Sequence, residues 1–308
     1  MTKQANCIMG LYAQTSIHAG TGQNTGAIDL PIQREGHNGY PCIYGSAMKG
    51  ALRSHAETQY GKAHDKVTLS FGPEMSDKGG SDHAGALMIG DARILLLPIR
   101  SLTSQFKWVT CPAVLSRYKQ DAKRFGIEAD FVIPEIPNTS GKDEAFAVIH
   151  EDKDKDKDKD RSLFLEEYRF KEKTHDLQKI ITTLSQLMAT QSDTEQNLQQ
   201  QLTIISNDMF SHISEHATPV NAHIAIDSIT KTAKSGALWY EETLPPETLL
   251  YVGISANASR KEKDDTSAES ILSYLNNLFF AEGVSPFLQV GGNETVGMGW
   301  CAVKTIKA

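Results

Sequence analysis

The pattern of hydrophobic residues at the start of the chain predicts a strand and then a helix. Residues 8–17 mix apolar with small polar residues, which is typical of a strand, and this segment ends at His18. Gly45 and Ser46 then predict a helix N-terminus with Ser46 as the N-cap. Apolar residues follow at helical spacing on one face of this helix, namely Met48, Leu52 and Ala56.

The middle of the chain predicts further strands and helices around a polar loop. Residues 94–97 are continuously apolar, as expected for a strand that enters the core, and residues 109–112 predict another strand. Residues 141–161 are polar, charged and repetitive, so we expect a disordered loop there. Two amphipathic helices are expected after this loop, at residues 177–188 and 199–216.

The C-terminal third predicts a hairpin, a helix and a closing strand. Strand patterns at residues 222–226 and 237–240 flank a turn rich in Ser, Thr and Lys, which is typical of a hairpin. A helix is expected at residues 267–280, and a glycine-rich loop precedes a last strand at 300–306. Helices and strands interleaved with antiparallel hairpins indicate an α+β fold.

Composition favours a globular protein of the cytoplasm. With 308 residues and 40% hydrophobic content, the chain can bury a large core. No apolar run approaches the ~18 residues that a membrane span needs, and the N-terminus lacks a signal-peptide pattern. The four cysteines are scattered without a C-x-x-C pair, so we expect neither disulfides nor a structural zinc site.

The net charge argues against a protein that coats nucleic acid over its whole surface. There are 31 Lys and Arg against 38 Asp and Glu, so the formal charge is −7. Because binding depends on local charge, an RNA-binding protein with its cations on one face remains compatible with this composition.

The most informative segment is 18–53, in which a glycine-rich loop, a lone Asp29 and a helix carrying two cations follow one another. Lys49 and Arg53 are four residues apart and share one helix face. Helix N-termini and aligned cations both favour phosphate groups. Spacing alone leaves open the alternative that this is a surface helix with solvated cations.

The order of motifs in this segment resembles the RAMP superfamily of CRISPR effector proteins. The motifs are His-x-Gly-x-Gly from His18, Ile-Asp-Leu-Pro-Ile-Gln-Arg-Glu at 28–35, and Gly-Ser-x-x-Lys-Gly-x-Leu-Arg at 45–53. More narrowly, the chain is similar to the multi-copy backbone subunits of type III-B (Cmr) complexes. Four later blocks extend the resemblance over most of the chain, at residues 85–101, 106–118, 223–242 and 288–300.

The resemblance implies one RAMP domain over residues 1–308, with a ferredoxin-like (RRM-like) core that is decorated into palm, fingers and thumb. Residues 162–217 would be a helical insertion on the palm, and residues 218–242 are the candidate thumb hairpin. The fold expected from the family therefore agrees with the α+β pattern of the chain.

In this family, the Asp of the second motif is required for cleavage of target RNA, which implies that Asp29 is catalytic. A carboxylate there suits a divalent metal, Mg²⁺ or Mn²⁺, beside a phosphate, or the orientation of an attacking 2′-hydroxyl. Spacing alone would also fit a turn-forming Asp. His18 is a supporting candidate, and Glu241 and Glu242 are candidates for a second acid, with an acidic strand end as the alternative.

A further set of residues is predicted to contact RNA. The C-terminal glycine loop is expected to approach the guide backbone, although it lacks the ending of a P-loop. Tyr240 is a candidate for stacking or hydrogen bonding. The remaining candidates are Arg34, Ser46, Lys49 and Arg53, together with Gly291, Gly292, Gly297 and Gly299.

The resulting hypothesis is a type III-B backbone subunit that binds guide RNA and cleaves complementary target RNA at regular intervals. The partners it implies are further copies of the chain, the small subunit, the large polymerase-like subunit and end-capping RAMP subunits, with no membrane. Two alternatives remain open: a structural RNA-binding subunit that does not cleave, and a guide-processing RAMP ribonuclease. The presence of Asp29 and its motif argues against both.

Overall fold

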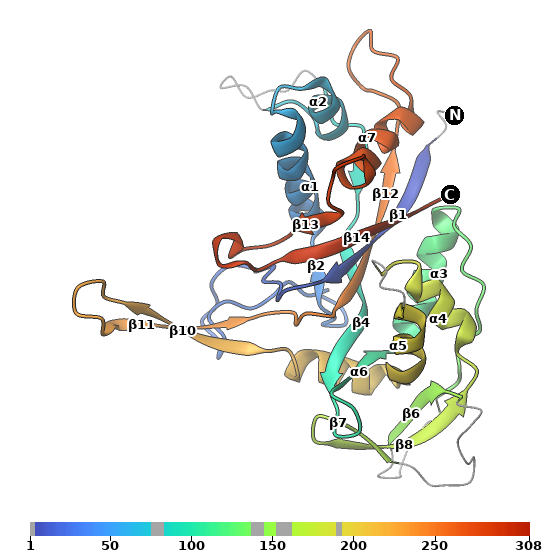
Figure 1. Cartoon of the computed structure of the whole chain (residues 1–308), viewed down its shortest axis with the longest axis vertical. Helices are drawn as coiled ribbons and strands as arrows, with labels where there is room; N and C mark the ends of the chain where they lie inside the picture. Colours follow the sequence, from blue (N-terminus) through green and yellow to red (C-terminus); the bar gives the residue numbers. More distant parts are fainter. Residues whose placement is uncertain (1–3, 75–82, 137–144, 152–161, 189–192) are drawn as a thin grey trace.

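Four antiparallel strands and two helices form the centre of the molecule in the order expected of a ferredoxin-like core. The computed structural model describes residues 4–74, 83–136, 145–151, 162–188 and 193–308. The central strands lie in the order β14–β1–β12–β4, with every neighbouring pair antiparallel. Since the chain visits them as β1, α1, β4, β12, α7 and β14, this is the βαββαβ topology with a long insertion after β4 (Figure 1). The elements are β1 (Ala5–Ala13), α1 (Gly45–Tyr60), β4 (Ala92–Arg100), β12 (Leu249–Ala256), α7 (Ala268–Phe280) and β14 (Trp300–Lys307).

The two core helices form where the apolar spacing predicts them. In α1 the buried residues are Met48, Leu52 and Ala56, as expected, and α7 begins after Ser267, whose hydroxyl accepts a hydrogen bond from the Ser270 N–H. Helix α1 begins at Gly45 and its N-cap is Tyr44. The prediction of Ser46 as the cap is therefore wrong.

Short elements complete the core. Strand β2 pairs with β4, β3 pairs with β12, and β13 pairs with β14. Their bounds, with those of a second helix and a 3₁₀ turn, are β2 (Cys42–Ile43), α2 (Asp65–Phe71), β3 (Leu87–Ile89), β13 (Phe287–Gln289) and η1 (Glu294–Val296). Within the described ranges, no helix is both long and apolar enough to span a membrane.

The insertion after β4 extends the same sheet and adds helices beside it. The sheet continues from β4 in the order β5–β9–β6–β8–β7, and the β5–β9 and β6–β8 pairs are parallel. Helices α3, α4 and α5 lie together beside the core strands (Figure 1). The bounds are β5 (Phe106–Thr110), α3 (Pro112–Arg124), β6 (Ala145–His150), β7 (Ser162–Leu165), β8 (Tyr168–His175), α4 (Gln178–Ser185), α5 (Thr194–Gln201), β9 (Leu202–Ile205) and α6 (Asn207–His216).

The single helix predicted at residues 199–216 is wrong, because a strand interrupts it. All four residues of β9 are buried, and the strand pairs with β5 on one side and β6 on the other. A short apolar run fits a buried strand as well as a helix, so its pattern alone does not separate the two. The insertion at 162–217 accordingly contains three strands as well as helices.

Only part of the predicted disordered loop at 141–161 falls within the described residues. Residues 145–150 form β6, which corrects the prediction for that part. Residues 141–144 and 152–161 lie outside the described residues.

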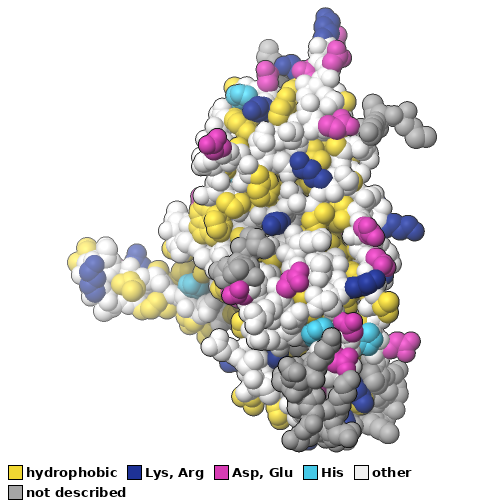
Figure 2. All heavy atoms as spheres, turned by 45° about the vertical axis from the view of Figure 1, so that its right-hand side comes forward, with side chains coloured by type: hydrophobic (Ala, Val, Ile, Leu, Met, Phe, Trp, Pro, Cys, Tyr) yellow, Lys and Arg dark blue, Asp and Glu magenta, His cyan; other side chains and the backbone are white. Residues whose placement is uncertain are grey.

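A two-stranded hairpin projects away from the main sheet (Figure 1). It consists of β10 (Val220–Ile226) and β11 (Ala233–Glu242), and it lies in the predicted thumb region. Hydrophobic side chains are visible along it in Figure 2. Those on the hairpin that are 41–89% exposed are Val220, Ile224, Ile226, Ile229, Leu238 and Tyr240. The hairpin therefore presents apolar side chains to its surroundings.

Candidate functional site

Asp29 lies at the base of the projecting hairpin, where its segment pairs with the end of β11. The Leu30 N–H donates to the Tyr240 carbonyl at 3.0 Å, and the Glu242 N–H donates to the Leu30 carbonyl at 3.0 Å. The Tyr240 N–H also donates to Asp29 Oδ2 at 2.7 Å. Asp29 is thus fixed through both its main chain and one carboxylate oxygen.

The second oxygen, Asp29 Oδ1, has no hydrogen-bond partner among the described residues. The preceding loop is closed by the Asn24 N–H, which donates to the Asp29 carbonyl at 2.9 Å, and residues 21–27 are exposed. Asp29 itself is only partly buried. The structure therefore presents one free carboxylate oxygen beside an exposed glycine-containing loop, at a fixed position.

His18 is buried beside the two glutamates predicted as second acids. Its Nδ1 lies 2.8 Å from the Glu242 carbonyl oxygen and 4.0 Å from Glu241 Oε1. Because a carbonyl can only accept, Nδ1 must donate, and in the neutral ring the lone pair is then on Nε2. His18 is therefore held in one tautomer whose Nε2 can accept a proton.

Glu241 is buried, with 3% of its surface exposed, and it is oriented by the C-terminal glycine loop. The Asn293 side-chain amide donates to Glu241 Oε1 at 2.6 Å. Asn293 has a left-handed backbone with φ of +61°, which Asn tolerates better than most residues. The structure thus brings Glu241, His18 and Asn293 together.

Glu242 is also buried, but its carboxylate is fully engaged within the protein. Oε1 accepts hydrogen bonds from the Arg34 guanidinium and the Thr218 hydroxyl, and Oε2 accepts one from the Ile32 N–H. A carboxylate bound in this way is not available for proton transfer to RNA. This geometry argues against the catalytic role predicted for Glu242 and favours a structural one.

For the same reason, the geometry argues against the predicted role of Arg34 as a phosphate contact. Besides Glu242 and Thr218, it donates from Nη1 to the Gly39 carbonyl at 2.9 Å and the Ser214 carbonyl at 3.0 Å. These four acceptors occupy the guanidinium inside the protein. The sequence did not reveal this, because the partners lie up to 208 positions away.

Four glycines in the loop at 291–299 were predicted to contact RNA. Two of them, Gly291 and Gly299, pack against the protein backbone instead of facing open space. A Cβ at Gly291 would lie 2.4 Å from the His18 carbonyl oxygen, and one at Gly299 would lie 2.2 Å from the Val290 carbonyl oxygen. The Gly292 N–H donates to the His18 carbonyl at 2.8 Å. Gly297 has no atom within 4 Å of its Cβ position, so of the predicted glycines only this one faces open space.

Helix α1 presents the predicted cations, but its first N–H group is already occupied. The Gly45 N–H donates to Asp91 Oδ1 at 2.7 Å, which places a carboxylate where a phosphate was expected. Arg53 pairs with Glu57 at 2.7 Å, one turn further along the helix. Lys49 has no ion-pair partner in the described part of the chain, and burial together with the nearby Arg53 and Arg260 lowers its pKa. Lys49 is thus the cation on this helix best placed for a phosphate, and Ser46 is exposed beside it.

Comparison with known proteins decides the family. A model that describes the RAMP superfamily matches residues 11–302. This chain belongs to the RAMP superfamily. It is 33% identical over 300 residues to the CRISPR system Cmr endoribonuclease Cmr4 of Pyrococcus furiosus, which covers 96% of this chain and 94% of the relative.

Two further relatives agree with this family. The CRISPR system CMR subunit Cmr4 of Saccharolobus solfataricus is 25% identical, with 94% of this chain and 92% of the relative aligned. The crystal structure of oligomeric Cmr4 from Pyrococcus furiosus superposes with a TM-score of 0.70 at 27% identity, covering 99% of each chain. The predicted family and the predicted RAMP fold are therefore confirmed.

The predicted divalent metal fits this RAMP site only if other ligands come from outside the protein. Among the described residues, no three His, Cys, Asp or Glu side chains are grouped closely enough to hold a metal ion. Mg²⁺ commonly uses one or two carboxylates and takes its remaining ligands from water and phosphate oxygens. The free oxygen of Asp29 meets that requirement, so Asp29 as a metal ligand stays a prediction.

Sequence reasoning missed three residues that organise this RAMP site. Asn293 orients Glu241, and Thr218 binds Glu242. Gln33 donates from Nε2 to the Gly20 carbonyl at 3.0 Å, and its Oε1 accepts from the Tyr44 N–H at 2.6 Å. It therefore joins the N-terminal glycine-rich loop to the start of α1. Gln33 lies within the motif at 28–35, and that motif is a signal that could have identified it as a site residue. Nothing in the sequence links Asn293 to Glu241.

Proposed function

We propose that this chain is a backbone subunit of a type III-B CRISPR ribonucleoprotein that holds guide RNA and cleaves complementary target RNA. The observation that supports this best is Asp29, whose free Oδ1 lies at the base of an apolar hairpin and beside an exposed loop. The relationship to a protein named as a Cmr endoribonuclease supports the same activity. We also propose that the protein acts in the cytoplasm.

The proposed reaction is attack of a target 2′-hydroxyl on its own 3′-phosphate. The hydroxyl loses its proton, the new bond forms at phosphorus, and the 5′-oxygen of the next nucleotide leaves and takes up a proton. The products are a 2′,3′-cyclic phosphate and a 5′-hydroxyl. This reaction requires in-line alignment of three atoms, and alignment alone can supply much of the rate.

Asp29 has the position to orient or deprotonate the 2′-hydroxyl, because Oδ1 is free while Oδ2 is fixed by the Tyr240 N–H. His18 supports it as a proton acceptor at Nε2, with its ring held by the Glu242 carbonyl. Glu241 Oε1 lies 4.0 Å from His18 Nδ1, which makes Glu241 the second acid that we propose for this site. A divalent ion bound to Asp29 and phosphate oxygens would add charge stabilisation.

The hairpin supplies the distortion that in-line geometry needs. Apolar side chains that enter between base steps unstack and kink a nucleic acid duplex. Ile224, Leu238 and Tyr240 are 53%, 55% and 41% exposed, and Tyr240 adjoins Asp29 through its backbone. A base step opened by the hairpin would therefore lie next to the carboxylate.

In this proposal several copies stack head to tail along one guide, so that cuts recur at a fixed spacing. The description of the solved relative as oligomeric supports the multi-copy assembly. The small subunit, the large polymerase-like subunit and end-capping RAMP subunits are the further partners we propose.

The test is to reconstitute the complex with one guide and an end-labelled complementary target. The proposal predicts a ladder of products with one constant interval and cyclic phosphate ends. A complex that binds the target and leaves it intact would identify the chain as a structural subunit. Cleavage of repeat RNA by the isolated chain would identify it as a guide-processing ribonuclease.

A further inference from the structure

The Arg34–Glu242 ion pair joins the segment of Asp29 to both ends of the projecting hairpin. Glu242 is the last residue of β11, and Thr218 lies two residues before β10. Both are buried, at 2% and 7% exposure. Glu242 Oε1 accepts from Arg34 Nη2 and Thr218 Oγ1, each at 2.5 Å, and Oε2 accepts from the Ile32 N–H at 3.0 Å.

Arg34 extends this contact to helix α6. Its Nη1 donates to the Ser214 carbonyl in α6 at 3.0 Å and to the Gly39 carbonyl at 2.9 Å. Three stretches of chain therefore meet at one largely buried ion pair: the motif at 28–35, the stretch from the last turn of α6 to the start of β10, and the end of β11. Removing one partner of such an ion pair strongly destabilises the structure around it, because the other charge is left without compensation.

The hairpin is bonded to the rest of the protein at its base, where this junction lies. Within the described residues, β10 and β11 pair along their length with each other and with no strand of the main sheet. The bonds that join them to the rest of the protein include the Leu30–Glu241 bridge, the Tyr240–Asp29 and Asn293–Glu241 hydrogen bonds, and the bonds around Glu242. Asp29 stands next to Leu30, so the same bonds fix both the carboxylate and the hairpin.

We propose that Arg34 and Glu242 are positioning residues that hold Asp29 and the hairpin at a fixed mutual geometry, so that bound target RNA is cleaved at a normal rate. This inference rests on the proposed function for its effect on cleavage. Its structural part, the rigid base of the hairpin, stands independently. Neither residue touches the RNA in this proposal.

The hydrogen-bond donors around Glu242 define a substitution that tests this proposal. All three groups that face Glu242 are donors in this structure: a guanidinium, a hydroxyl and a backbone N–H. A carboxylate offers only acceptors, whereas a glutamine must turn its NH₂ group towards a donor. Glu242→Gln therefore keeps the size of the side chain and disrupts the junction.

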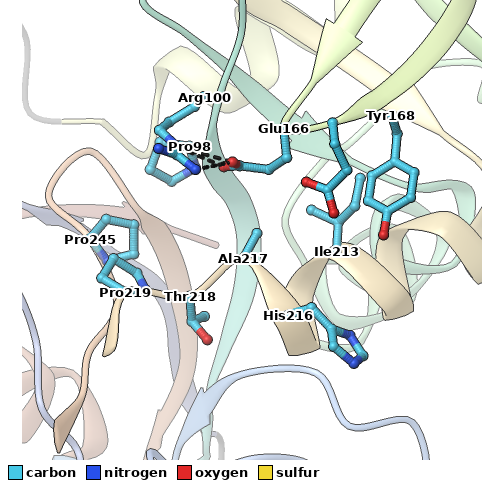
Figure 3. Close-up of a pocket in the computed structure, with 11 residues that line it drawn as sticks. Pro98, Arg100, Glu166, Tyr168, Ile213, His216, Ala217, Thr218, Pro219 and Pro245 are labelled. Atoms are coloured by element: carbon cyan, nitrogen blue, oxygen red, sulfur yellow. Dashed lines mark hydrogen bonds and ion pairs between the residues drawn. The ribbon is translucent and has the colours of Figure 1, made fainter. Parts of the chain in front are cut away.

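The matched control is a second Arg–Glu pair, Arg100–Glu166, which shares no hydrogen bond with Arg34 or Glu242 although Thr218 lines the same cavity. Arg100 donates from Nε to Glu166 Oε2 at 2.9 Å beside a cavity of about 460 Å³ (Figure 3). The Arg100 side chain is 85% exposed, so this pair adds little to stability. Glu166→Gln makes the same chemical change and should alter neither the hairpin nor cleavage.

The first measurement is hydrogen-exchange mass spectrometry on the free full-length chain, on peptides that cover residues 28–34 and 220–242. We expect exchange in both peptides to accelerate about tenfold or more in Glu242→Gln and to stay unchanged in Glu166→Gln. Unchanged exchange in Glu242→Gln would overturn the proposal whether or not the wild-type chain cleaves RNA.

The second measurement uses the reconstituted complex and separates binding from chemistry. Misplacement of a reacting group by about 1 Å costs on the order of 100-fold in rate, so the single-turnover cleavage rate of Glu242→Gln should fall by that order while target affinity stays the same. A residue that only stabilises the fold would lower the melting temperature and the yield of complex, and leave the rate of each assembled complex normal. That result would overturn the positioning role.

A milder variant decides the case if Glu242→Gln fails to fold. Thr218→Val keeps the shape of the side chain and removes one of the three donors. We expect a smaller change of the same kind, with faster exchange at 220–242 and slower cleavage at normal target affinity. Wild-type exchange and cleavage in this variant would contradict the proposal. A wild-type complex that does not cleave would contradict the proposed function alone.

Discussion

Replacing Asp29 with asparagine tests whether the charge of this side chain drives cleavage. The structure makes the substitution informative, because Asp29 also has an architectural role: Oδ2 accepts the Tyr240 N–H at 2.7 Å. The asparagine carbonyl oxygen can accept that bond, with its NH₂ group in place of the free Oδ1. Asp29→Asn therefore removes the charge and keeps the pairing at the base of the hairpin.

The expected magnitudes differ between Asp29→Asn and Asp29→Ala. Loss of a general base typically costs about 10²–10⁴ in rate, which we expect for both variants. Asp29→Ala also removes the acceptor of the Tyr240 N–H. Because this bond is exposed and water can replace the acceptor, the cost is about 0.5–1.5 kcal/mol. For a chain of 308 residues, each kcal/mol lowers the melting temperature by roughly 1.5–2 °C. Asp29→Asn should melt within about 1 °C of the wild type, because its hydrogen bond persists.

The assay combines three measurements on the reconstituted complex and the free chain. Target affinity comes from gel-shift titration, the cleavage rate from single-turnover kinetics with end-labelled RNA, and stability from thermal unfolding of the free chain. We expect unchanged affinity, a slow rate and normal melting for Asp29→Asn. Cleavage by this variant at the wild-type rate would refute the reasoning, because the free Oδ1 would then have no chemical role.

Four further outcomes follow from the same structure. Chelation with EDTA should stop cleavage and leave target RNA bound if a divalent ion acts at the site; full activity in chelator would favour metal-free acid–base chemistry by Asp29 and His18. Gly291→Ala should lower the melting temperature clearly more than Gly297→Ala, since both need positive φ but only the first places a Cβ 2.4 Å from a carbonyl oxygen. Lys49→Ala should reduce the salt dependence of guide RNA binding by about one counterion, whereas Lys123→Ala, on exposed α3 surface, should not. Thiol reagents at pH 8 should label the native chain very slowly and should label all four cysteines after unfolding. The reason is that burial raises the pKa of each thiol, to about 12 for Cys7, Cys42 and Cys301, and also above its ordinary value for Cys111.

Local pattern determined the elements whose partners are close in sequence. The apolar face of α1, the capped helix α7 and the hairpin β10–β11 all follow from spacing within about twenty residues. The motifs around Asp29 indicated the family, and in the structure that residue lies on a segment that is hydrogen-bonded to β11. Such features are predictable because the residues that stabilise them are neighbours along the chain.

Tertiary structure alone decided which polar residues are free to act and which are occupied. By residue type, Arg34 suits a phosphate contact and Glu242 suits a catalytic acid. In the structure they bind each other, although they lie 208 positions apart in the sequence. Asn293 meets Glu241 across 52 positions, and residues 202–205 become a strand because two other strands flank them. The physical reason is that burial and hydrogen bonding determine what a polar side chain can do, and both depend on segments that only the folded chain brings together.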